Sequence, residues 1–189
     1  INRWAERCRS KMVLFEGNSH IAGMYYIREL GSEAGAPNAA RHIDAQGQCV
    51  APGFVDVHNH SDGWLRKIPN FTPKTLQGFT TEVIMADGIS YAPVDAQTWP
   101  HGVYYMRALN GLQLSDYDGW ESLDDYMRGL DGTTCQNAIT HLPYAHLRTM
   151  AMGWGRAVPD DVQMGEIVAG VERGMSEGAV GLSTGLDYI

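Results

Sequence analysis

The stretch from Val50 to His60, which reads VAPGFVDVHNH, constrains this chain more than any other. A Pro-Gly turn precedes the apolar run Phe54–Val57, whose β-branched residues favour a short buried strand. His58 and His60 follow that strand. Residues i and i+2 of an extended chain face the same side, so both imidazoles project together. Such a pair can bind one metal ion at a strand end, and it can equally be two exposed loop histidines.

Four segments of the chain, in order, resemble the amidohydrolase superfamily of metal-dependent hydrolases. APGFVDVHNH at residues 51–60 resembles the first-strand signature of that superfamily. QGFTTEV at 77–83, DGISYAP at 87–93 and EGAVGLSTGL at 177–186 resemble its N-acyl-D-amino-acid deacylase branch. One His-x-His pair is a weak signal, whereas four segments in the family's order are a strong one. The resemblance implies an α/β fold, the TIM-type (β/α)₈ metallo-hydrolase barrel.

The order of predicted elements fits about the first four βα units of such a barrel. Thr72 followed by Pro73 predicts a helix start, and a strand is predicted at 80–86, so the first two strands should be parallel with a right-handed crossover. Further strands and capped helices are predicted at 136–143 and 179–185, and at 123–130 and from Asp160 onward. The apolar face of that last helix, marked by Met164, Ile167 or Val168, Val171 and Met175, should pack on the sheet.

Two domains are predicted, with residues 1–50 as an incomplete or anomalous N-terminal β-domain segment and residues 51–189 as the N-terminal half of the barrel. A complete barrel needs eight units and about 250 residues. We therefore expect the chain to be the N-terminal portion of a larger enzyme, inactive by itself. A half barrel has open parallel edges, so the chain alone should aggregate or remain partly molten unless a partner completes the barrel. No catalytic residue is assigned within the chain, because the resemblance places two further histidine ligands, a general-base aspartate and a substrate-binding arginine beyond Ile189.

Asp87 follows the second predicted strand, at a position where many deacylases carry a zinc-binding cysteine. By resemblance, Asp87 is the third metal ligand beside His58 and His60; the alternative is a turn aspartate ahead of Gly88. A carboxylate can bind Zn²⁺ or bridge two divalent ions, and it also suits Mn²⁺ or Fe²⁺. The expected cofactor is thus one or two divalent ions, Zn²⁺ foremost.

Three further residues receive site predictions with open alternatives. Asp62 can orient a ligand histidine through a hydrogen bond, or it can cap a helix or turn. Tyr188, by resemblance, reaches the scissile carbonyl or the carboxylate of the substrate. Ser183, by resemblance, lines the substrate pocket, and it can instead pack inside the barrel.

The resemblance implies hydrolysis of the amide bond of an N-acyl-D-amino acid by metal-activated water. The D configuration rests on the resemblance alone. One alternative is a cyclic-amide amidohydrolase of the dihydropyrimidinase or dihydroorotase kind. Those enzymes usually need a bridging carbamylated lysine, and no lysine lies at a predicted strand end, the three in the chain being Lys11, Lys67 and Lys74. A second alternative is a non-catalytic relic that keeps the fold signature.

The resemblance implies a small-molecule N-acyl amino acid substrate, and composition argues against one other class of partner. A net charge of −8, with 14 Lys and Arg residues, argues against a nucleic-acid surface. The sequence shows no apolar run of membrane-spanning length and no signal-peptide pattern, so a cytoplasmic location and no membrane partner are expected. The three widely spaced cysteines, Cys8, Cys49 and Cys135, favour reduced thiols. Oligomeric state is not predicted.

Overall fold

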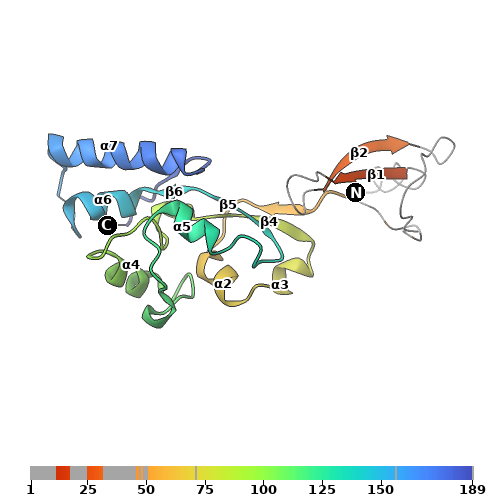
Figure 1. Ribbon diagram of the computed structural model, residues 1–189, viewed down its shortest axis with the longest axis horizontal. Helices are drawn as coiled ribbons and strands as arrows, with labels where there is room; N and C mark the ends of the chain where they lie inside the picture. The colour runs from red at the N-terminus through yellow and green to blue at the C-terminus, as the bar shows by residue number, and fades with distance from the viewer. Residues whose placement is uncertain are drawn as a thin grey trace. The chain divides into compact units, whose positions relative to one another are not determined.

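The computed structural model describes residues 12–17, 25–31, 46, 48, 51–70, 72–155 and 157–188. The chain divides into two compact units, Ile1–Pro52 and Gly53–Ile189. In the first, β1 (Met12–Gly17) pairs with β2 (Tyr25–Gly31) in antiparallel register (Figure 1). Cys8, Cys49 and most of the segment leading to residue 51 lie outside the described residues.

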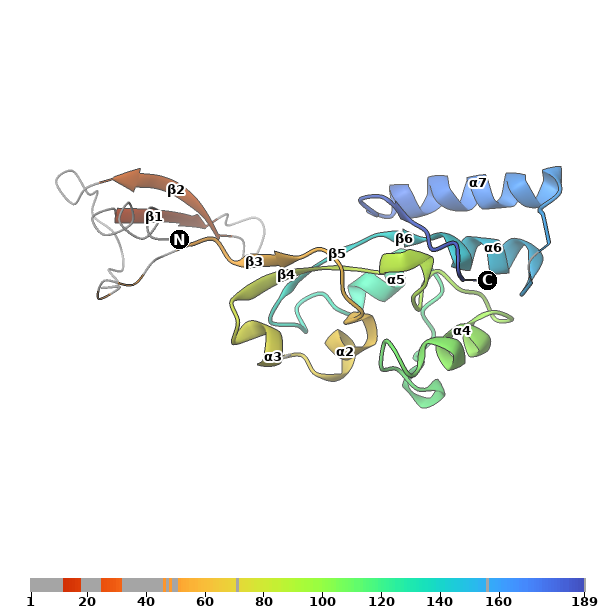
Figure 2. The ribbon, with the colours of Figure 1, turned by 180° about the vertical axis from the view of Figure 1, so that it is seen from behind.

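The second unit is built on parallel strands, as predicted. The strands β3 (Phe54–Asp56), β4 (Phe79–Ile84) and β5 (Asn137–Thr140) lie side by side in that order (Figure 2). Between β3 and β4 the chain forms α2 (Asp62–Lys67) and the short helix α3 (Thr72–Thr75). The parallel strand–helix–strand unit expected from the Thr72-Pro73 signal is therefore present.

The third predicted strand is divided at His141. Its first part is β5, and its second part, β6 (Leu142–Pro143), pairs in parallel with β7 (Leu182–Ser183). The His141 N–H still donates to Ile84 O at 3.1 Å, whereas the Leu142 N–H donates to Gly181 O at 2.8 Å. The chain thus changes partner from β4 to the β7 segment within two residues. Such a stagger between neighbouring strands is what tilted barrel strands require, although the described strands do not close a barrel.

The prediction that Phe54–Val57 is buried is wrong. The exposed fractions of Phe54, Val55 and Val57 are 57%, 50% and 67%. Among the described residues, β3 is hydrogen-bonded to β4 alone, so it is an edge strand. β4 lies between β3 and β5, and its Val83 and Ile84 are buried.

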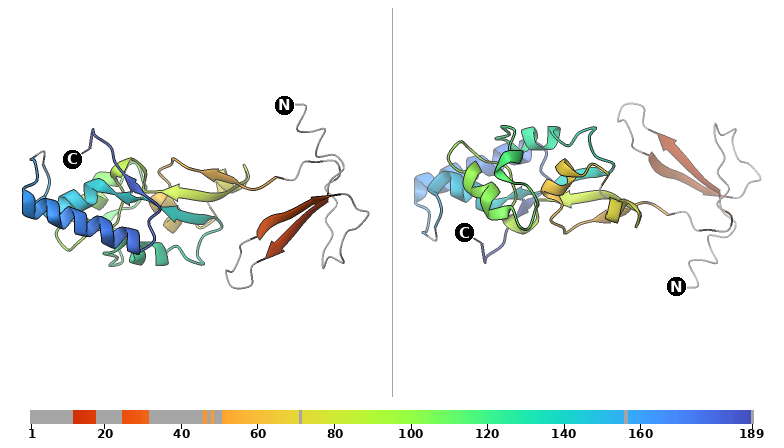
Figure 3. Two further views of the ribbon diagram at one scale, coloured as in Figure 1. Left: turned by 90° about the horizontal axis from the view of Figure 1, so that it is seen from above. Right: turned by 90° about the horizontal axis from the view of Figure 1, so that it is seen from below.

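The main hydrophobic core lies between the carboxyl-terminal half of β4 and the helices that follow. These are α4 (Trp99–Met106), α5 (Leu123–Arg128), α6 (Tyr144–Met152) and α7 (Asp161–Ser176), with short 3₁₀ turns η1 (Ala86–Gly88) and η2 (Leu114–Asp116). Figure 3, which views the chain from above and from below, shows α7 nearest on one side and α4 nearest on the other. Tyr91, Tyr126 and Leu142 are among the fully buried core residues.

The capped helix starts are confirmed. Ser122 caps α5 in a reciprocal capping box with Asp125, and Asp160 caps α7 with Gln163. The predicted apolar face of α7 is only partly correct, because Ile167 is buried whereas Met164, Val168 and Met175 are 44%, 49% and 43% exposed.

The packed side of α7 also includes two glycines, Gly170 and Gly174, of which Gly174 is buried. A Cβ added at Gly170 would approach Leu147 Cδ2 to 2.8 Å, and one at Gly174 would approach Leu142 to 2.6 Å. Small residues therefore let α7 lie close against α6 and β6 (Figure 1). No described helix is both long and apolar enough to traverse a bilayer.

Candidate metal centre

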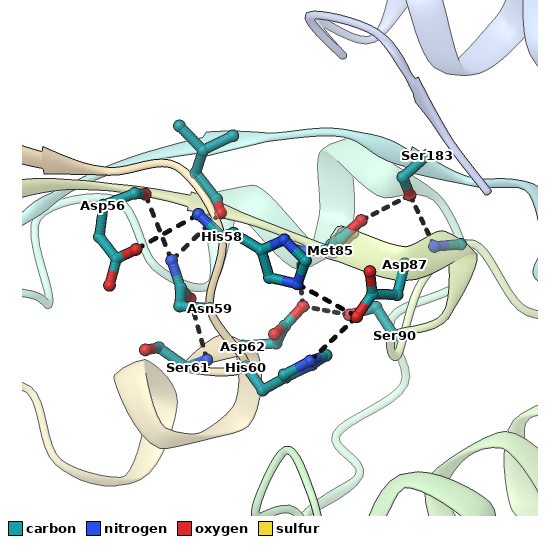
Figure 4. A network of polar contacts seen from close by, with 12 residues as sticks. Asp56, His58, Asn59, His60, Ser61, Asp62, Met85, Asp87, Ser90 and Ser183 are labelled. Atoms are coloured by element: carbon teal, nitrogen blue, oxygen red, sulfur yellow. Dashed lines mark hydrogen bonds and ion pairs between the residues drawn. The ribbon is translucent and has the colours of Figure 1, made fainter. Parts of the chain in front are cut away.

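Three potential metal ligands converge where β3 and β4 end. His58 Nε2 and His60 Nε2 each lie 3.2 Å from Asp87 Oδ2. One donor atom from each of the three residues lies within 4.8 Å of the others (Figure 4). The structure therefore brings together the two histidines and the aspartate that the sequence singled out, over a separation of 29 residues between His58 and Asp87.

The geometry of this trio fits a bound divalent ion. Tetrahedral Zn²⁺ with bonds of about 2.0–2.1 Å separates its ligand atoms by about 3.3 Å, close to the 3.2 Å from Asp87 Oδ2 to each Nε2. Two imidazoles and one carboxylate form a donor set that suits Zn²⁺ and also Mn²⁺ or Fe²⁺. The Asp87 and His60 side chains are 29% and 24% exposed, so a water or substrate can reach the centre.

Asp87 lies in a turn with an unusual backbone. Met85 and Asp87 both have positive φ, at 63° and 59°, and Gly88 follows at 79°. A non-glycine residue in the left-handed region costs on the order of 1–3 kcal/mol, and such strain persists only where the surroundings impose it. A Cβ at Gly88 would lie 2.8 Å from Thr184 Cα, so only glycine fits between this turn and the β7 segment.

Asp62 holds this turn from one side. Its Oδ1 accepts hydrogen bonds from the Met85 N–H at 2.8 Å and from Ser90 Oγ at 2.5 Å. The carboxyl is fully buried, and burial raises the pKa of Asp62 above its ordinary value against the opposing effect of these two bonds. Ser61 is the N-cap of α2 and makes no side-chain cap bond, so Asp62 is neither the N-cap nor, among the described contacts, a hydrogen-bond partner of a histidine.

One polar atom of Asp62 and one of His60 are left without a partner in the described part of the chain. These buried atoms are Asp62 Oδ2 and His60 Nδ1. Charge on the His60 ring lowers the pKa of Asp62 through space. The predicted orientation of a ligand histidine by Asp62 therefore stays a prediction.

Ser183 holds the same turn from the other side. Its Oγ donates to Met85 O at 2.6 Å and accepts from the Gly88 N–H at 3.1 Å (Figure 4). Asn59 makes a comparable link between the strands, since its Nδ2 donates to Asp56 O and to Val83 O. The sequence offered a signal for Asn59, which lies between the two histidines, but none for the pairing of Ser183 with Met85.

Tyr188 lines an open groove beside the carboxyl ends of β6 and β7. This groove, of about 520 Å³, is also lined by Tyr144, Arg148 and Thr184. The backbone at Gly185 places the Tyr188 ring near the candidate centre, because a Cβ there would meet both the ring and Asp87 O at 2.4 and 2.5 Å. Ser183 does not line the groove.

His146, in α6, bonds the segment that follows the Asp87 turn. Its Nε2 accepts from the Ser90 N–H at 3.0 Å, and its Nδ1 lies 2.9 Å from Pro93 O. Burial lowers the pKa of His146 to about 4, so the ring is neutral and Nδ1–H donates to Pro93. His146 thus supports Ser90, which in turn bonds Asp62.

Comparison with known proteins identifies the kind of protein to which this site belongs. The model of the Amidohydrolase family matches residues 41–187. N-acyl-D-aspartate deacylase from Alcaligenes xylosoxydans xylosoxydans is 33% identical over 86% of this chain and 31% of its own length. D-aminoacylase from the same organism is 34% identical over 80% of this chain and 31% of its own length. The chain therefore spans about a third of the length of these relatives.

Solved structures agree with the sequence matches. A crystal structure of D-aminoacylase superposes with a TM-score of 0.70 at 30% identity, over 86% of this chain and 33% of that one. N-acyl-D-glutamate deacylase from Bordetella bronchiseptica, solved with zinc and a phosphonate mimic of the tetrahedral intermediate, gives 0.67 at 32% identity over 86% and 33%. A further matching structure of D-aminoacylase was solved to study the binuclear metal centre of that enzyme. From its sequence, its parallel strands and these matches, the chain belongs to the amidohydrolase family.

Proposed function

We propose that the protein carrying this chain hydrolyses the amide bond of N-acyl-D-amino acids with a metal-activated water. The observation that carries the proposal is the convergence of His58, His60 and Asp87 at the ends of two neighbouring parallel strands. The relatives named for D-aminoacylase and N-acyl-D-aspartate deacylase activities supply the substrate class. This chain spans about a third of their length, so the activity is proposed for the complete protein.

The residues of this chain would supply one side of the centre. His58 and His60 would bind one divalent ion, and Asp87 would bind the same ion or bridge it to a second. A bound Zn²⁺ lowers the pKa of its water toward 7 and polarises the scissile carbonyl. Tyr188 would contact the carbonyl or carboxylate of the substrate from the adjacent groove. Ser183 is better explained by its two backbone bonds than by contact with substrate.

The cyclic-amide alternative has less support. Lys67 bonds Asp116, and Lys74 bonds Asp56 and Glu82, so each described lysine pairs with carboxylates outside the histidine and aspartate trio.

The test is hydrolysis of a panel of N-acetyl-D- and N-acetyl-L-amino acids by the complete protein, with and without chelator. We expect metal-dependent release of the free D-amino acid and at most weak release of the L form. Hydrolysis of dihydropyrimidines with no action on the panel would replace the proposal with the cyclic-amide alternative. No metal-dependent hydrolysis of either class would refute it in favour of a non-catalytic relic.

A further inference from the structure

The turn that carries Asp87 is held through both backbone polar groups of one residue, Met85. The Met85 N–H donates to Asp62 Oδ1, and the Met85 carbonyl accepts from Ser183 Oγ. Asp62 comes from the segment after β3 and Ser183 from β7, so the two contacts arrive from opposite neighbours of the turn. Met85 itself is fully buried and left-handed, with φ 63° and ψ 43°.

These contacts determine the direction of the chain immediately before Asp87. Rotation of Met85 into an ordinary extended or right-handed conformation would turn its N–H or its carbonyl away from these partners. Ser183 Oγ also accepts from the Gly88 N–H, so one hydroxyl bonds residues on either side of Asp87. The strained residues thus lie between fixed points, as is expected where a fold imposes an unfavourable backbone conformation.

The acceptor on the other side is itself held in place. Ser90 Oγ donates to the same Asp62 oxygen that binds Met85, and the Ser90 N–H donates to His146 Nε2. A fully buried carboxylate is costly unless it is hydrogen-bonded. Asp62 is 0% exposed and lies two residues after His60, so one acidic group links the histidine segment to the turn that carries Asp87.

We propose that Asp62 and Ser183 are positioning residues for the metal centre, clamping Met85 so that the Asp87 carboxylate points at His58 and His60. Neither residue is a ligand. Both act through Asp87, and the loss of either should therefore loosen the carboxylate without removing a donor atom. This inference rests on the metal centre of the proposed function.

The test is a double-mutant cycle on metal affinity in the complete protein. Zn²⁺ affinity is measured by competition with a chromogenic chelator for the wild type, Ser183→Ala, Asp87→Ala and the double variant. Residues that orient metal ligands typically change metal affinity 10- to 100-fold. We expect Ser183→Ala to weaken Zn²⁺ binding by about that factor in the wild-type background and by less than about 3-fold when Asp87 is already alanine.

Matched variants separate positioning from general destabilisation. Ser183→Thr keeps the hydroxyl and should stay within about 3-fold of wild-type affinity. Ser122→Ala removes a serine hydroxyl that caps α5 away from the centre, and it should leave Zn²⁺ affinity unchanged. Asp62→Asn keeps an acceptor for the Met85 N–H, so it should weaken binding less than Asp62→Ala. Loosening of the carboxylate should also change the visible absorption of the Co²⁺-loaded Ser183→Ala protein.

Two results would overturn the inference in distinguishable ways. Equal loss of affinity on Ser183→Ala in both backgrounds, or no loss in either, would show that Ser183 does not act through Asp87 while leaving the proposed function intact. A wild-type protein that binds no Zn²⁺ would remove the metal centre itself and the proposed function with it.

Discussion

The neighbouring strands β3 and β4 each lead into part of the same candidate site, yet they are supported differently. Among the described strands β3 has one hydrogen-bonded neighbour, and half or more of the surface of Phe54 and of Val55 is exposed. β4 has neighbours on both sides, and its last three residues are buried. His58, after β3, has a side chain that is 64% exposed, whereas Asp87, after β4, sits in a turn bonded by Asp62 and Ser183. The comparison teaches that the positions of the two histidines depend on local sequence, whereas the position of Asp87 depends on contacts with distant residues.

Truncation of one apolar side chain on each strand should give the largest difference in lost stability between β3 and β4. Ile84 in β4 is fully buried and Val55 in β3 is 50% exposed. Ile84→Ala should lower the free energy of unfolding by about 4 kcal/mol through lost burial and a cavity. Val55→Ala should cost about 0.5 kcal/mol, as surface changes do. Urea unfolding of the complete protein measures both, and equal losses would mean that β3 is covered in that protein.

The register pair Asp56 and Glu82 offers a second comparison. Both carboxylates bond Lys74 Nζ at 2.6 Å, but the Glu82 side chain is 0% exposed and the Asp56 side chain 22%. Removing one member of a buried ion pair typically costs about 3–5 kcal/mol, so Glu82→Gln should cost about 3 kcal/mol. Asp56→Asn should cost about 1 kcal/mol. The prediction fails if the urea midpoints of the two variants coincide.

Protonation of His146, which supports the β4 side of the site, should lower the free energy of unfolding. Its folded pKa is about 4, below the ordinary 6.5, so the unfolded chain binds the proton first as pH falls. Stability from the neutral ring is therefore complete above pH 6.5 and is lost as pH falls toward 4, by about 2 kcal/mol between pH 6.5 and 5. His146→Gln keeps a donor and an acceptor without a titrating ring. It should remove this part of the pH dependence of unfolding, and an unchanged slope would contradict the assignment.

A small loss of stability with no effect on the metal centre should come from a site remote from both strands. Ser122→Ala removes the α5 cap, in which Ser122 Oγ accepts from the Asp125 N–H at 3.0 Å. A lost cap typically costs about 1 kcal/mol. Thermal unfolding should show that loss with no change in bound metal. A loss of metal would mean that stability alone controls the site.

The sequence predicted that His58, His60 and Asp87 would lie close together because each follows a strand by only a few residues. Parallel strands end at one edge, so His58, His60 and Asp87 meet there whatever the details of the helices. The capping boxes at Ser122 and Asp160 also depend only on residues close together in the sequence, so they could be predicted in the same way. These predictions needed only the order and type of the elements.

The predictions that failed depended on neighbours that no local pattern specifies. Phe54 and Val55 have the composition of a buried strand, but burial depends on what pairs beside it. Met164 and Val168 share the helical period of Ile167, but close contact at Gly170 and Gly174 determined which stripe of α7 packs. The bonds of Ser183 to a turn 98 residues away in the chain are tertiary contacts that sequence spacing does not encode.

The most direct test of the account is the metal content of the complete protein and of its Asp87→Ala variant. Each is dialysed against Zn²⁺, passed through a desalting column and measured by elemental analysis, with Asp95→Ala as a control on a half-buried aspartate that bonds Thr98. The account predicts bound Zn²⁺ in the wild type and the control, and a loss of at least one equivalent or a large fall in affinity in Asp87→Ala. Unchanged Zn²⁺ content and affinity in Asp87→Ala would contradict it.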